Sequence, residues 1–128
     1  MRAKTERRRR NGQFKLLDRF SSLRDALNGL GILVVEQHNA RIHLVVATCV
    51  LALGLLTGLS GLEWILVFAA IALVWMAEAF NSALEYLADA AVPDTHPLIG
   101  KAKDVAAAGV LISASFAVMV GLWAFIPG

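Results

Sequence analysis

The sequence predicts an all-α membrane protein, in which an N-terminal amphipathic interfacial helix is followed by three transmembrane helices. Hydrophobic residues make up 58% of the chain and the mean hydropathy is +0.65, so the chain is more apolar than ordinary soluble domains. Residues 42–59 and 105–126 contain no Asp, Glu, Lys or Arg. Each run is long enough for a membrane-spanning helix, which needs about 20 residues (range about 17–25). A third uncharged run, residues 64–77, lies between them.

The N-terminal segment is expected to lie on the membrane surface. Residues 1–13 are predicted to form a basic, flexible tail that contacts anionic lipid headgroups, and we expect no nucleic-acid partner. In residues 14–36, apolar side chains recur every three or four positions, as in an amphipathic helix: Leu16, Phe20, Leu23, Leu27 and Leu30. Gly29 and Gly31 predict a break or bend in this helix. Residues 36–43 are polar and predict an elbow before the first span.

The spans are predicted at residues 42–59, 63–90 and 104–126. Together with the amphipathic helix they form one predicted domain, residues 14–128. The second span must accept acidic side chains near its end, and Pro93 and Pro97 are expected to stop that helix. Because three helices make a thin bundle, we expect an oligomer that covers part of the second span.

Positive charge is distributed unevenly along the chain. Ten of the 12 Lys and Arg residues lie between Arg2 and Arg41, and the other two are Lys101 and Lys103. By the positive-inside rule, the N-terminus and the loop after the second span are cytoplasmic, and the C-terminus is outside. The second helix then runs from outside to inside, and its acidic residues lie in the cytoplasmic half of the membrane.

These acidic residues belong to a polar stripe, formed by Glu78, Asn81, Glu85 and Asp89 at spacings of three, four and four residues. Such spacings place the side chains on one side of a helix. Ionisable groups at membrane depth are costly and usually face a bundle interior, a cavity or a partner. The stripe therefore predicts a chemical site. The alternative is a non-enzymatic oligomer that conducts ions or protons through the same acids.

The same half of the protein carries Lys103 and Asp104. Carboxylates with a lysine suit Mg²⁺ and phosphate, because Mg²⁺ binds one or two carboxylates plus substrate phosphates, and lysine neutralises phosphate charge. The sequence has no GxxxxGK[ST] loop, so a nucleotide site must have another design. Conduction is disfavoured because the outer half of the second span has no polar groups to continue a path.

Two segments are similar to the prokaryotic diacylglycerol kinase family, which includes the undecaprenol kinases: residues 78–89 (EAFNSALEYLAD) and 96–111 (HPLIGKAKDVAAAGVL). Residues 22–29 (SLRDALNG) and 39–44 (NARIHL) resemble its N-terminal patterns. The resemblance implies a homotrimeric kinase of the bacterial inner membrane that transfers the ATP γ-phosphate to a lipid alcohol with Mg²⁺. The lipid is undecaprenol or diacylglycerol. The HPL and AKDVAA stretches look closer to the undecaprenol branch.

The resemblance also implies roles for single residues. Glu78 matches the catalytic base, and Glu85 matches a metal ligand. The implied nucleotide-binding positions are Asn81, Asp94, Thr95, His96, Lys103 and Asp104. The implied substrate-binding positions are Glu78, Arg24 and Ala107.

The second metal ligand departs from the family pattern. When residues 39–41 are aligned without a gap, Gln37 occupies the position of the family's glutamate, and Glu36 lies one residue early. Either a local bulge lets Glu36 bind the metal, which we expect, or the site is altered. Three residues also have simple structural interpretations: Asp104 as a helix N-cap, Asp89 as a solvated helix end, and His43 as an interfacial side chain.

Overall fold

The computed structural model describes residues 16–92 and 94–126, and the predicted basic tail at residues 1–13 lies outside them. Four helices follow one another: α2 (Leu16–Glu36), α3 (His38–Thr57), α4 (Gly61–Ala91) and α5 (Pro97–Phe125). The chain divides into two units, Met1–Gly31 and Ile32–Gly128. The all-helical class is confirmed, and α3, α4 and α5 are each long and apolar enough to cross a membrane.

The first unit contains the larger part of α2. Its apolar side chains at Phe20, Leu23 and Leu27 are exposed, which suits a helix that would lie on lipid. The predicted break at Gly29 and Gly31 is wrong, because α2 continues through both to Glu36. A glycine inside a helix costs only about 1 kcal/mol relative to alanine, and neither glycine here takes a positive φ.

The second unit begins with the last turn of α2 and one linking residue. Gln37 alone leaves the helical conformation, with φ −96° and ψ 117°, and α3 begins at His38. The predicted elbow of residues 36–43 is therefore wrong in extent. The backbone N–H of Gln37 still donates to the carbonyl of Leu33 at 3.0 Å, so a single residue is enough to separate the two helices.

A short turn connects α3 to α4. Gly58 ends α3 in the left-handed region (φ 72°), and its N–H donates to the carbonyl of Gly54. Ser60 then caps α4: its hydroxyl accepts from the Glu63 N–H, and the Glu63 carboxylate accepts from the Ser60 N–H at 2.6 Å. This capping box explains why α4 starts two residues before the predicted span.

The α5 helix begins seven residues before the predicted third span. Pro97 occupies its first turn, where a missing N–H has no cost, and His96 is the N-cap, with Nδ1 accepting from the Leu98 N–H at 3.2 Å. Asp104 therefore lies inside the helix, and its interpretation as the N-cap is wrong. Because α5 starts early, Lys103 and Asp104 lie within the helix.

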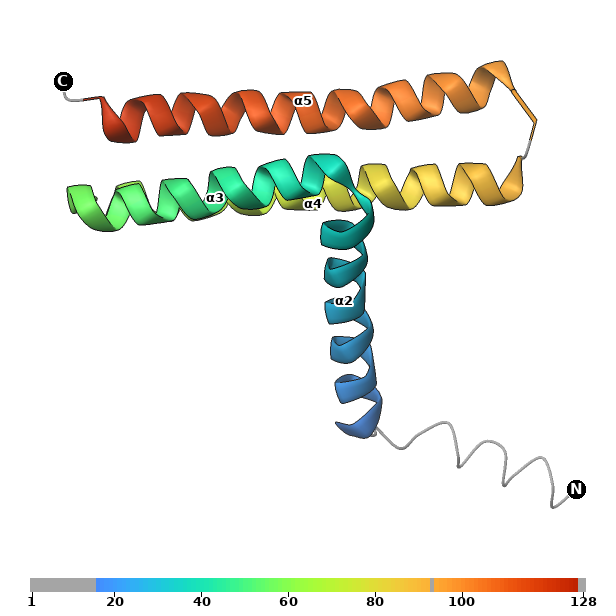
Figure 1. Cartoon of the computed structure of the whole chain (residues 1–128), viewed down its shortest axis with the longest axis horizontal. Coiled ribbons are helices and arrows are strands. Elements are labelled where there is room, and N and C mark those ends of the chain that lie inside the picture. Colours follow the sequence, from blue (N-terminus) through green and yellow to red (C-terminus); the bar gives the residue numbers. More distant parts are fainter. Residues whose placement is uncertain (1–15, 93, 127–128) are drawn as a thin grey trace, which may run out of the picture. The chain divides into compact units, whose positions relative to one another are not determined.

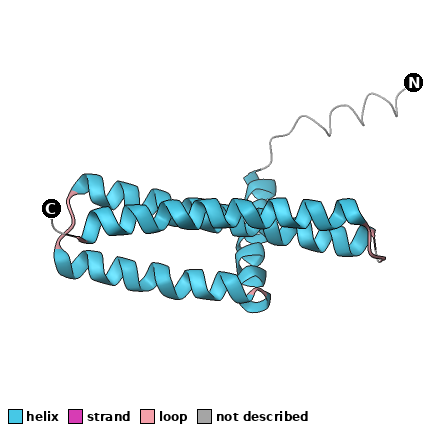
Figure 2. Cartoon of the chain, turned by 90° about the horizontal axis from the view of Figure 1, so that it is seen from above, coloured by secondary structure: helices cyan, strands magenta, loops and turns pink. Residues whose placement is uncertain are grey.

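Within the second unit, α3, α4 and α5 run side by side and alternate in direction (Figures 1 and 2). The closest packing is between α4 and α5, with Val67, Ala70 and Val120 at its centre. Gly54 lets α3 approach the start of α4, because a Cβ there would lie 2.9 Å from the ring of Trp64. Most other apolar side chains face outward, as expected of helices surrounded by lipid.

Candidate active site

Three polar side chains of α4 are buried within one turn. Glu78 and Ser82 are each 1% exposed, and Asn81 is 7% exposed. Glu78 Oε2, Asn81 Oδ1 and Ser82 Oγ find no hydrogen-bond partner among the described residues, and we call them the three buried oxygens. A buried polar atom without a partner costs about 1–3 kcal/mol. Such a cost is typical of a site that receives its partner from a ligand.

Glu78 and Asn81 form the polar wall of a pocket of about 330 Å³. The start of α3 supplies another wall, with Asn39, Ile42 and His43. The small or apolar face of α5 supplies the third, with Ala107, Val110, Leu111 and Ala114. We call this the polar pocket. Ala107, a substrate-binding residue predicted from the resemblance, thus lies on the same pocket as Glu78.

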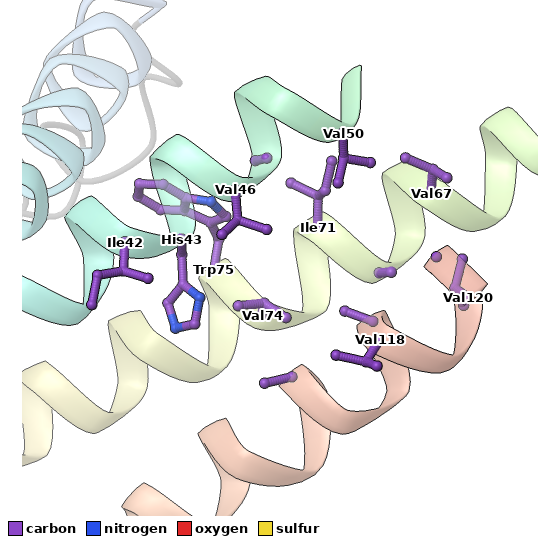
Figure 3. A pocket seen from close by; sticks show the side chains of 15 residues that line it. Ile42, His43, Val46, Val50, Val67, Ile71, Val74, Trp75, Val118 and Val120 are labelled. Atoms are coloured by element: carbon purple, nitrogen blue, oxygen red, sulfur yellow. The ribbon is translucent and has the colours of Figure 1, made fainter. Parts of the chain in front are cut away.

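An apolar groove of about 300 Å³ continues from the polar pocket, with which it shares Ile42, His43 and Ala114. Figure 3 shows Ile42, His43 and Trp75 at one end of the groove and Val67 and Val120 at the other. His43 is half-buried and lines both spaces, and its interpretation as an interfacial side chain stays a prediction. A ligand with a polar head and an apolar chain would match the polar pocket and the apolar groove that continues from it.

Glu85 and Asn81 are linked along α4. Asn81 Nδ2 donates to Glu85 Oε1 at 3.2 Å, as expected for residues four apart on a helix. Glu85 is half-buried. Along α4, Asn81 therefore lies between Glu78 and Glu85, and its Oδ1 atom accepts no hydrogen bond from the described residues.

Tyr86 connects α4 to the junction of α2 and α3. Its hydroxyl donates to Glu36 Oε2 at 2.9 Å and accepts from Gln37 Nε2 at 3.0 Å. Both candidates for the second metal ligand therefore contact the same phenol. Tyr86 was not among the predicted site residues; its only signal in the sequence is a polar aromatic directly after Glu85.

Asp89, the last member of the polar stripe, forms an ion pair with Lys103 of α5. Lys103 Nζ donates to Asp89 Oδ1, across the loop between the two helices. Asp89 is 69% exposed in its side chain, but it is not simply a solvated helix end, because it holds this lysine. Asp104 is exposed.

Other predicted residues lie in two places. Asp94, Thr95 and His96 are exposed in the loop between α4 and α5, at the same end of the helices as Lys103. Arg24 belongs to the first unit, where its side chain is exposed and lies 3.8 Å from the Asp25 carboxylate. Its predicted contact with substrate stays a prediction.

The side chains near Tyr86 and Glu85 offer the type of donor atom that magnesium binds. Glu36, Glu85 and the Asn81 Oδ1 atom are oxygen donors, which Mg²⁺ prefers. In residues 16–92 and 94–126, no three Asp, Glu, His or Cys side chains converge on one point. Mg²⁺ does not require such a cage, because it is usually held by one or two carboxylates together with substrate phosphates.

Comparison with known proteins identifies the family. Residues 24–125 match the model of the prokaryotic diacylglycerol kinases. The chain belongs to this family. It is also 33% identical to the undecaprenol kinase of Bacillus subtilis (strain 168) over 108 residues, which are 84% of this chain and 88% of that protein. The protein is thus a lipid kinase by family, a phosphotransferase with three candidate membrane spans, and the family implies that it uses ATP and a lipid substrate.

Proposed function

We propose that this diacylglycerol kinase family member transfers the γ-phosphoryl group of ATP to the hydroxyl of a membrane lipid alcohol, with Glu78 as general base. The observation that carries the proposal is the position of Glu78, a buried carboxylate on the wall of a pocket that continues into an apolar groove. A lipid chain in the groove would bring its hydroxyl to Glu78. A lipid alcohol needs both a polar site for its hydroxyl and an apolar channel for its chain.

The chemistry follows from that placement. Glu78 accepts the hydroxyl proton as the lipid oxygen attacks the γ-phosphorus; the new O–P bond forms, the bond to the β-phosphate oxygen breaks, and ADP leaves. Positioned general bases typically contribute 10²–10⁴-fold to a rate. Asn81 lies beside this carboxylate on the pocket wall, and its buried Oδ1 atom would accept a hydrogen bond from the nucleotide or its water shell, in line with its predicted nucleotide-binding role.

The nucleotide would bind at the adjoining end of α4 and α5. Lys103 would neutralise phosphate charge, and Asp94, Thr95, His96 and Asp104 would contact the nucleotide. Glu85 and Glu36 would hold Mg²⁺, which would offset the negative charge of the nucleotide phosphates. The contact with Asp89 holds the Lys103 ammonium near the loop between α4 and α5, which supports this proposed role.

The undecaprenol kinase similarity makes undecaprenol our first choice of substrate, with diacylglycerol as the second. We further propose a homotrimer in the bacterial cytoplasmic membrane, with the N-terminus inside and the C-terminus outside. The uneven Lys and Arg distribution supports this orientation.

The test is phosphate transfer from labelled ATP with Mg²⁺ by the purified, detergent-solubilised protein, with undecaprenol and diacylglycerol offered in parallel. Transfer to one lipid supports the proposal and fixes the substrate, whereas transfer to both defines a permissive kinase. Folded, oligomeric protein that transfers phosphate to neither lipid would contradict the proposed reaction. Glu78→Gln, which keeps shape and removes basicity, should bind nucleotide and lose turnover.

A further inference from the structure

We propose that Tyr86 is a positioning residue, which holds Glu36 in place as the second carboxylate of the magnesium site. The inference rests on the proposed kinase function and deepens it. The starting point is the expectation from the resemblance that, with residues 39–41 aligned without a gap, Gln37 occupies the position of the family's glutamate and Glu36 lies one residue earlier.

The two hydrogen bonds to Tyr86 have fixed directions. A Gln side-chain nitrogen only donates, so the phenol oxygen accepts from Gln37 Nε2 at 3.0 Å. The phenol has a single proton, and this proton goes to Glu36 Oε2 at 2.9 Å. The amide therefore orients the hydroxyl, and the hydroxyl orients the carboxylate.

The backbone at the junction explains why two consecutive side chains can reach one phenol. Glu36 is the last residue of α2, and Gln37 is the one residue with extended backbone before α3 begins. A continuous helix would turn these neighbours about 100° apart. The extended conformation at Gln37 changes that angle, and it is the local irregularity that lets Glu36 serve in place of a carboxylate at position 37.

Tyr86 also fixes Glu36 relative to the other proposed ligand. It directly follows Glu85 on α4, and Glu85 is itself held by Asn81 Nδ2. A carboxylate bound through one oxygen keeps its second oxygen for a metal. Metal-binding carboxylates are usually supported in this way, and loss of such support typically costs 10–100-fold in metal affinity.

Gln37 is the less suitable metal ligand. Its amide is neutral, whereas Mg²⁺ favours carboxylates. Its nitrogen donates to Tyr86, which gives it a supporting role. We therefore assign Gln37 a supporting role in the same hydrogen-bond chain and Glu36 the metal-binding role.

The test measures metal binding apart from turnover. Mn²⁺ replaces Mg²⁺ as a spin probe, and its binding to the full-length solubilised protein with a β,γ-imido ATP analogue is followed by electron paramagnetic resonance. Tyr86→Phe keeps the ring and removes the hydroxyl; it should weaken Mn²⁺ binding about 10-fold or more. Thr57→Val is the matched control, because it removes a helix hydroxyl bonded to the Leu53 carbonyl, far from this site in the chain.

A double-mutant cycle separates positioning from a general structural effect. Glu36→Gln should weaken Mn²⁺ binding to a similar extent, and adding Tyr86→Phe to it should cause little further loss, because Tyr86 acts through Glu36. Equal losses from Tyr86→Phe in both backgrounds, or unchanged Mn²⁺ affinity in the single variant, would overturn the inference. Wild-type protein that neither binds Mn²⁺ with nucleotide nor transfers phosphate would instead overturn the proposed function.

Discussion

Replacing Glu78 with Gln is expected to stabilise the folded protein while it removes activity. The Glu78 side chain is 1% exposed, and its Oε2 atom meets no hydrogen-bond partner in the part of the chain that the structure describes. A polar group buried in this way costs about 1–3 kcal/mol, and a carboxylate costs more than a neutral amide of the same shape. The free energy of unfolding should therefore rise by about 1–3 kcal/mol in Glu78→Gln.

Two measurements on the same preparations test whether Glu78→Gln gains stability while it loses activity. Unfolding in mixed micelles with increasing SDS reports stability, and phosphate transfer from labelled ATP reports turnover, which should fall about 10²–10⁴-fold without the base. Glu63→Gln is the matched control, because it makes the same change on the same helix and Gln also serves in a capping box. It should leave both quantities near wild type.

The reasoning would be refuted by a Glu78→Gln protein that is less stable than wild type, since the carboxylate would then be held by favourable contacts. Retention of full turnover in this variant would equally refute the assignment of Glu78 as the base. A stabilised, inactive variant is the outcome that a functional site predicts, because catalytic groups are commonly kept at a cost to stability.

Three further predictions concern packing, nucleotide and lipid. Gly54→Ala should lower the free energy of unfolding by about 1–3 kcal/mol in the same SDS titration, because the added methyl meets the Trp64 ring at 2.9 Å. Lys103→Met should weaken ATP analogue binding by about 10-fold or more in a filter or fluorescence assay, while its effect on stability stays within about 1 kcal/mol, because the Asp89 partner is largely exposed. Ala114→Phe should raise KM for lipid and leave KM for ATP unchanged, because Ala114 lies where the polar pocket meets the apolar groove; Ser115→Phe on the exposed side of α5 is its control.

The number and order of the helices could be predicted because two charge-free runs reach membrane length and the third reaches it once the acids of the polar stripe are accepted within it. The residues at which the helices begin could be predicted less well. The start of α4 had a readable signal, since Ser60 and Glu63 have the spacing of a capping box. The start of α5 had a weaker one, because Pro97 both stops a preceding helix and opens a following one.

The polar stripe was predictable for a different reason. Its members lie on one helix, so periodicity alone brings Glu78, Asn81 and Glu85 together. Contacts between helices carry no such signature. Tyr86 and Glu36 are 50 residues apart, and Lys103 and Asp89 are 14 apart, so these pairs become visible only when the packing is known.

The length of α4 would allow one helix to serve both a lipid and a water-soluble nucleotide, as the proposed function requires. Its 31 residues extend about 46 Å, whereas the hydrocarbon core is about 30 Å thick and needs about 20 residues. Counted from Gly61, about 20 residues reach the level of Asn81. On the proposed topology, Glu78 would lie just within the apolar layer, beside the lipid hydroxyl, and Glu85 would lie beyond it, on the side of the ATP phosphates. The continuous helix fixes the separation between these two carboxylates, so α4 can hold the acceptor and the donor of the phosphoryl group in register across the boundary between lipid and water.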